Sequence, residues 1–258
     1  MINKIKFKVF TGGSKCSASG KKYEKEVNAI CRSVQAHGSA HPLSTMDDKD
    51  LGGCTSRFDL QLNWGGGARN VNVEIKRNTP DWVQTSIVPS TTQRRSPRIS
   101  IIQWRVKAAS PFSHIFDGIL AGKHVFDDVP SFACEGKNRN SADWEKERAL
   151  FPDKYIECHD NCIADAYRVK GVEYIQVFGY GLYHTGNDSC NLGVPMFLCK
   201  QKLRIRCKRH GKRCKDTGKY VPSSITASLR PVLKTLQPSG LSLDNCDSLM
   251  NSGVFMRC

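Results

Sequence analysis

Two acidic residues and a lysine, Asp59, Glu74 and Lys76, have the types and spacing in this sequence that best suit chemistry. They lie in two short segments, 58–62 and 71–76, in which apolar and polar residues alternate with the period of a β-strand. The glycine-rich stretch between the segments suits a hairpin turn. If the strands pair so that their apolar residues share one face, the two carboxylates and the ammonium group meet on the other face.

Two carboxylates beside an ammonium group favour metal-assisted hydrolysis of a phosphate ester. Mg²⁺ or Mn²⁺ binds carboxylate oxygens, polarises a phosphoryl oxygen and lowers the pKa of a bound water, while a lysine can orient that water. Acid-x-Lys alone is a weak signal, because Glu135-Gly-Lys137 also matches it. Only the match ending at Lys76 has a hairpin partner with an aspartate on the matching face. The alternative is a solvated sheet face with a cross-strand ion pair.

The hairpin resembles the catalytic hairpin of the PD-(D/E)XK nuclease superfamily. The resemblance implies that Asp59 and Glu74 bind the metal, that Ile75 offers a backbone carbonyl and that Lys76 is the catalytic lysine. The chain departs from the family pattern in having Phe58, not proline, directly before the aspartate.

The resemblance extends to the expected first helix. Gly20-Lys-Lys-Tyr-Glu24 is similar to the family's Gly-x-x-x-Glu motif, which implies that Glu24 is an auxiliary metal or water ligand. Its alternative is a helix-surface glutamate paired with a neighbour on the helix.

The family core is a helix, a three-stranded meander, a second helix and a fourth strand. The resemblance therefore implies an α/β, restriction-endonuclease-like core with a long insertion. Periodicity predicts an edge strand at 5–9, a loop at 11–20, helices at 21–35 and 161–170, and strands at 98–106, 173–178 and 195–207. We expect a single nuclease domain, 1–258, with its core at about 1–77 and 158–208, the insertion at about 78–157 and a C-terminal tail at about 215–258.

The chain is strongly basic. Lys and Arg outnumber Asp and Glu by 39 to 24 in 258 residues, which gives a net charge of +15. Such an excess favours a polyanionic partner, most commonly nucleic acid. A composition of 39% hydrophobic and 24% charged residues is globular and excludes a disordered chain.

A second alternating segment, 200–208, buries Leu203 and Ile205 and aligns cations on its other face, about 6.6 Å apart. This spacing approximates that of phosphates along a nucleic-acid strand, although a solubilising strand edge is the alternative. A loop with three arginines forms a second basic cluster. The expected nucleic-acid contacts are Lys200, Lys202, Arg204, Arg206, Lys208, Arg209, Arg94, Arg95 and Arg98.

Twelve cysteines without an export signal indicate reduced thiols, so we expect an intracellular protein, cytoplasmic or nuclear, with no membrane segment.

Cys158-His-Asp-Asn-Cys162 is interpreted as a helix start with buried thiols. Zinc is the less favoured use of the others, because no Cys-x-x-Cys pair is present. The candidate zinc ligands are Cys207, His210 and Cys214, with Cys199 or Cys190 as a fourth.

These features together predict a Mg²⁺- or Mn²⁺-dependent deoxyribonuclease, more specifically an endonuclease. The alternatives are a nucleic-acid-binding protein without cleavage activity and a nuclease that acts on RNA or branched DNA. DNA is the expected partner, and the sequence leaves a homodimer open.

Overall fold

The computed structural model describes residues 13–51, 58–65, 68–78, 81–89, 104–106, 111–126, 149–209 and 223–258. The protein is of mixed α/β class, as expected, and it divides into two compact units. Unit 1 comprises the described parts of Met1–Thr79, Gly171–Phe197 and Gln237–Cys258, and unit 2 those of Pro80–Lys170 and Leu198–Leu236. The strand expected at 5–9 lies outside the described residues.

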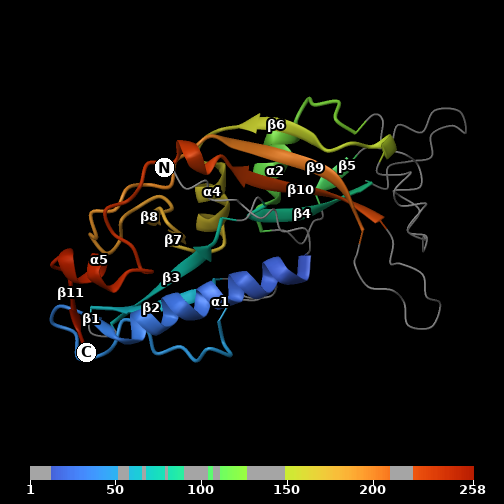
Figure 1. Ribbon diagram of the computed structural model, residues 1–258. Coiled ribbons are helices and arrows are strands. Elements are labelled where there is room, and N and C mark those ends of the chain that lie inside the picture. Colours follow the sequence, from blue (N-terminus) through green and yellow to red (C-terminus); the bar gives the residue numbers. More distant parts are fainter. Residues whose placement is uncertain are drawn as a thin grey trace, which may run out of the picture. The chain divides into compact units, whose positions relative to one another are not determined.

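Helix α1, Gly13–Arg32, opens unit 1 and lies against the β2–β3 hairpin (Figure 1). It begins inside the segment 11–20, so the prediction of a loop there is wrong. Its buried stripe consists of Tyr23, Val27 and Cys31, which recur every four residues and therefore share one face. The helix ends near Ser33, whose N–H bonds to the carbonyl of the residue three before it.

The β-hairpin expected from the sequence is confirmed in unit 1. Leu60 lies opposite Val73 and Leu62 opposite Val71, so the apolar sets of both strands enter the same core. A parallel strand then pairs with the second strand of the hairpin, and an antiparallel strand completes the sheet in the order β2-β3-β7-β8. The bounds are β2 Leu60–Trp64, β3 Arg69–Lys76, β7 Tyr174–Val177 and β8 Gly181–His184.

The segment 237–258, the last part of the expected C-terminal tail, belongs to unit 1. Its strand β11, Phe255–Arg257, pairs with β1, Val34–Ala36, and helix α5 spans Cys246–Asn251. Buried leucines and Phe255 join the hydrophobic core that also contains the α1 stripe. The amphipathic pattern of this segment is short and interrupted by Ser and Asp, so periodicity did not predict its helix and strand.

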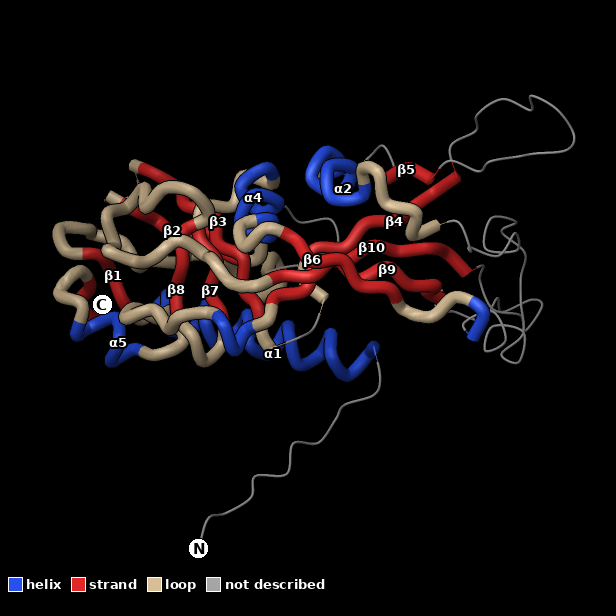
Figure 2. The backbone as a smooth tube through the Cα atoms, turned by 90° about the horizontal axis from the view of Figure 1, so that it is seen from above, coloured by secondary structure: helices blue, strands red, loops and turns tan. Residues whose placement is uncertain are grey.

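Unit 2 contains an antiparallel sheet in the order β5-β4-β10-β9-β6, and Figure 2 shows β4, β10 and β9 side by side. The expected helix at 161–170 is confirmed as α4, whereas the strand expected at 195–207 begins only at Gln201. The bounds are β4 Val83–Pro89, β5 Trp104–Val106, β6 Lys154–Cys158, β9 Gln201–Arg209, β10 Ser223–Pro231, α2 Ser113–Leu120, α4 Cys162–Val169 and the 3₁₀-helix η2 Leu233–Thr235.

The two faces of this sheet differ in chemistry. Leu203 and Ile205 of β9 lie opposite Leu229 and Ala227 of β10, and all four are buried. Helix α4 contacts β10, and α2 contacts β5. The alternate residues of β9 are cations, so the pattern read from the sequence places them on the opposite face.

Within the described residues, no helix is long and apolar enough to cross a membrane.

Candidate functional site

Asp59, Glu74 and Lys76 meet in unit 1 on one face of the hairpin. Lys76 Nζ lies 2.6 Å from Oε1 of Glu74 and 3.2 Å from Oδ2 of Asp59. The three side chains are 11%, 6% and 17% exposed for Asp59, Glu74 and Lys76 respectively. One ammonium group therefore binds both carboxylates in a largely desolvated place, where electrostatic interactions are stronger than in water.

The hairpin register explains why the two acids meet. Asp59 directly precedes β2, and its N–H donates to the carbonyl of Val73 at 3.0 Å. The paired register ends at Leu60↔Val73, and Asp59 lies at this end of the ladder, where it shares Lys76 with Glu74. Like charges close together are destabilising, and the ammonium group of Lys76 offsets that repulsion.

The backbone of Ile75 fixes the aspartate. Its N–H donates to Asp59 Oδ2 at 2.9 Å, and its side chain is buried in the core. Because Ile75 lies between Glu74 and Lys76 in β3, its core-facing side chain directs theirs to the opposite face. The expected role of the Ile75 carbonyl as a metal ligand remains a prediction.

Glu24 of α1 lies within the electrostatic field of these residues. Burial raises the pKa of Glu24 above its ordinary value, and the negative charges of Asp59 and Glu74 raise it further, partly opposed by Lys76. The carboxylate of Glu24 on the first helix is thus electrostatically coupled to the pair on the hairpin. Its half-buried position differs from that of a fully solvated helix-surface glutamate.

The donor set of the hairpin suits a hard divalent cation. Mg²⁺ typically takes one or two protein carboxylates and keeps several waters, and Asp59 and Glu74 provide two. Among the residues that the structure describes, no three His, Cys, Asp or Glu side chains are grouped closely enough to hold a metal. Glu24 is therefore electrostatically coupled to the pair without completing a three-ligand cluster.

A buried glutamine that the sequence reading missed joins the sheet to α1. Gln176 of β7 lies opposite Ile75 in the parallel register and is fully buried. Its amide donates to Tyr23 Oη at 3.2 Å and to Ser242 Oγ at 2.9 Å, and its carbonyl accepts the N–H of Leu243 at 2.9 Å. A lone glutamine inside an apolar strand was the available signal, because a buried amide must find partners.

A second contact fixes α1 at the end of β3. Arg77 donates to Ser19 Oγ at 2.7 Å, and its guanidinium lies 5.0 Å from the ring centroid of Phe178. The Phe178 ring in turn meets Tyr23 edge to face at 5.1 Å. Arg77 thus fastens the helix that carries Glu24 to the strand that carries Glu74 and Lys76.

The cations expected on β9 do share one face, but acidic residues accompany them. Lys202 pairs with Glu157 at 2.8 Å, and Arg204 pairs with Asp153 at 2.5 Å. Lys208 donates to a glutamine of β4. The sequence predicted the cations from local alternation but missed their acidic partners, which come from β6 and from the segments before β4 and β6. The Arg209 side chain and residues Arg94, Arg95 and Arg98 lie outside the described residues.

The zinc hypothesis gains no support from the described residues. Burial raises the pKa of Cys199 to about 12, which disfavours the thiolate that zinc binds. Cys207 is buried on the apolar face of β9. His210 and Cys214 lie outside the described residues, and Cys190 belongs to unit 1.

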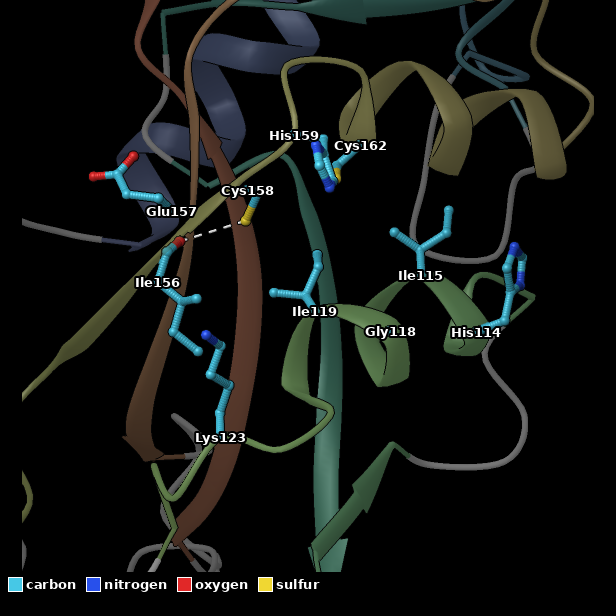
Figure 3. Close-up of a pocket in the computed structure, with 10 residues that line it drawn as sticks. All are labelled: His114, Ile115, Gly118, Ile119, Lys123, Ile156, Glu157, Cys158, His159 and Cys162. Atoms are coloured by element: carbon cyan, nitrogen blue, oxygen red, sulfur yellow. Dashed lines mark hydrogen bonds between the residues drawn. The ribbon is translucent and has the colours of Figure 1, made fainter.

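A cavity of about 620 Å³ in unit 2 is separate from the chemistry of the hairpin. It is lined by residues of α2, β6 and the start of α4, including His114, Lys123, Cys158 and Cys162 (Figure 3). Cys162 is the first residue of α4 and is buried, as predicted, whereas Cys158 ends β6 and is only half-buried. The Cys158 thiol donates to the carbonyl of Ile156 at 3.4 Å.

A further hydrogen bond couples the two thiols of this cavity. It lowers the pKa of Cys162 and raises that of Cys158, so a thiolate forms first at Cys162.

Comparisons with protein-family models, with curated proteins and with solved structures find no match to this chain.

Proposed function

We propose that this protein is a metal-dependent nuclease that hydrolyses phosphodiester bonds in DNA, as an endonuclease. The observation that carries the proposal is the meeting of the Asp59 and Glu74 carboxylates on the ammonium group of Lys76. Buried acids close together are costly, and a fold that keeps them has a use for concentrated negative charge. That use is the binding of a divalent cation.

A restriction-endonuclease-like core is part of the same proposal. In chain order, α1, the β2–β3 hairpin, α4 and β7 follow the helix, strands, helix and strand that the resemblance implies, although α4 belongs to unit 2 and the other elements belong to unit 1. The parallel pairing of β7 with β3 also supports it. The short β1 pairs with β11 and not with the hairpin, so it does not supply the third strand of the expected meander.

Each residue has a distinct role in the proposed reaction. Asp59 and Glu74 would hold Mg²⁺ or Mn²⁺, with Ile75 offering its carbonyl and Glu24 holding a water. A bound cation supplies Lewis-acid polarisation of the phosphate and a more acidic water. Lys76 would orient the attacking water and offset negative charge that develops on the phosphate. The Ile75 N–H holds Asp59 in place throughout.

The second candidate is a protein that binds nucleic acid without cutting it. It is favoured by the same ion pairs, because Lys76 neutralises part of the acidic charge without any metal. The cationic face of unit 2 would then carry the function. Cleavage of RNA or of branched DNA is the remaining alternative for the catalytic reading.

The test is incubation of the full-length protein with closed circular, linear, branched and single-stranded DNA and with RNA, in Mg²⁺ or Mn²⁺ and in EDTA. An endonuclease opens the closed circle, and an exonuclease leaves it intact. Asp59→Asn, Glu74→Gln and Lys76→Ala should each lower the rate at least about 100-fold, the typical cost of losing one transition-state charge contact.

Lys22→Ala is the matched control, because Lys22 and its ion-pair partner Glu26 are both exposed on α1. It should cut at the wild-type rate. Metal-dependent cleavage by Lys76→Ala at the wild-type rate would show that the active-site assignment is wrong.

A further inference from the structure

One carboxylate in unit 2 gathers three arginines from two strands. Asp81, just before β4, lies 3.1 Å from Arg204 Nη1, 3.2 Å from Arg206 Nη2 and 3.3 Å from Arg230 Nε. Ser228 Oγ donates to the same carboxylate at 3.1 Å. The three arginine side chains are only 13%, 24% and 27% exposed, so this cluster is a half-buried concentration of positive charge.

Arg206 is the least well satisfied member of the cluster. Burial lowers its pKa, and the positive charge of Arg204 lowers it further. Its Nε–H is buried and has no hydrogen-bond partner among the residues that the structure describes. Leaving a buried donor unpaired costs free energy, most of all on a charged group.

Thr226 supplies a second unpaired group beside it. The two residues are directly opposite in the β9–β10 register, so their side chains are neighbours on the same face. Thr226 is 1% exposed, and its Oγ1 also lacks a hydrogen-bond partner among the described residues. Both groups can donate a hydrogen bond, so a single oxyanion at these adjacent cross-strand positions would accept from both.

We propose that Arg206 and Thr226 form a binding site for a phosphate group. Arg204 and Arg230 flank the site, and their planar guanidinium groups suit the oxygens of a phosphate. Asp81 is the internal counter-anion: it holds the arginines in place and competes with the phosphate for them.

We assign the phosphate to a nucleic-acid backbone, and this assignment rests on the proposed function. The oxyanion site itself does not depend on that function. Tyr155 lies opposite Arg204 on this face, is 50% exposed and accepts a hydrogen bond from Arg230 at 3.1 Å. An exposed aromatic ring beside a phosphate site is the arrangement on which nucleobases stack. The contacts to phosphate carry no sequence information, so binding should be independent of sequence.

The test measures binding of a labelled single-stranded oligonucleotide by the full-length protein in EDTA, with inorganic phosphate as a competitor. Thr226→Val keeps the shape and removes the hydroxyl, and should weaken binding about 10-fold, the loss of one charge-assisted hydrogen bond. Because Val also removes an unpaired buried hydroxyl, the free protein should melt at the same or a higher temperature. Weaker binding by a Thr226→Val protein that melts at the same or a higher temperature is then not explained by misfolding.

Two variants test the role of charge. Asp81→Asn should tighten binding about 5-fold, because the competing carboxylate charge is gone. Glu157→Gln is the matched control, since it removes one negative charge from the same face at Lys202, outside the cluster. Arg206→Ala should weaken binding and reduce the slope of log affinity against log salt by about one.

Equal tightening by Asp81→Asn and Glu157→Gln would overturn the site, because only bulk charge would then matter. Unchanged affinity of Thr226→Val for both the oligonucleotide and inorganic phosphate would overturn it as well. Weaker binding of inorganic phosphate to Thr226→Val, with unchanged oligonucleotide affinity, would overturn only the nucleic-acid backbone as the source of the phosphate. None of these binding experiments measures cleavage. A result that overturns this site therefore differs from a result that overturns the proposed nuclease activity.

Discussion

Glu74 and Lys76 leave β3 on the same face, and Lys76 Nζ lies 2.6 Å from Glu74 Oε1. The same ammonium group reaches Asp59 at 3.2 Å. Lys76 is therefore a structural counter-charge as well as the proposed catalytic lysine, and the two roles predict different measurements.

Lys76→Ala should destabilise the protein in EDTA by about 3 kcal/mol, because it leaves two neighbouring buried carboxylates without their cation. Urea denaturation measures the loss. Mg²⁺ should restore stability to this variant more than it stabilises wild type, since a bound ion replaces the missing charge. The exposed Lys22→Ala should change stability by less than about 0.5 kcal/mol. Equal stability of Lys76→Ala and wild type in EDTA would contradict the buried ion-pair interpretation.

Glu24→Gln should make the protein more stable at neutral pH. The folded pKa of Glu24 lies above its ordinary value of 4.5, so the native state binds this proton more tightly than the unfolded chain does. The stability that this proton contributes is fully present below pH 4.5 and is lost as the pH rises through the folded pKa. The advantage of the variant should therefore appear at neutral pH and vanish near pH 4.

Thermal melts of both proteins from pH 4 to pH 8 check this, with Glu26→Gln as the exposed control on the same helix. A constant difference across the whole range would argue against the coupling of Glu24 to Asp59 and Glu74.

Gln176→Leu should destabilise the protein by about 2 to 4 kcal/mol. The leucine cannot pair with Tyr23, Ser242 or the N–H of Leu243, and at least one buried group is left without its partner. Denaturant titration gives the loss. Asn72→Ala, a half-buried position on the neighbouring strand, serves as control and should cost about 1 kcal/mol. Matching losses in the two variants would show that the buried network is not cooperative.

Cys162 should react with iodoacetamide at pH 7.5 at least about 10-fold faster than Cys31, because the thiolate is the reactive form. The hydrogen bond from Cys158 lowers the pKa of Cys162, whereas complete burial raises that of Cys31 to about 12. Peptide mapping after timed alkylation measures both rates. Cys158→Ala should slow the reaction at Cys162, since it removes the donor. An unchanged rate in that variant would exclude the thiol pair as the cause.

Local periodicity was enough to predict the hairpin and the side on which its charged residues lie. Alternation in 58–62 and 71–76 fixes which side chains share a face, and burying both apolar sets excludes a one-residue slip from the register that is found. The same reasoning placed the cations of β9 on one face, opposite Leu203 and Ile205. Both predictions depend only on residues close together in the sequence.

Other elements had no such local signal. Strand β10 alternates small hydroxyl residues with apolar ones, a weak pattern that gains its stability from pairing with β4 and β9. The start of α1 lies in a Gly- and Ser-rich stretch with low helix propensity, and its extension over that stretch was missed.

The sequence alone determined which charges share a strand face, because side-chain direction in a β-strand follows from position. Only the tertiary structure decided what those charges meet. Asp81 reaches the arginines of β9 and β10, and Gln176 reaches Tyr23, across long separations in the chain. Such contacts depend on which strands become neighbours, and that choice is made by the burial of the whole apolar surface and not by any single segment.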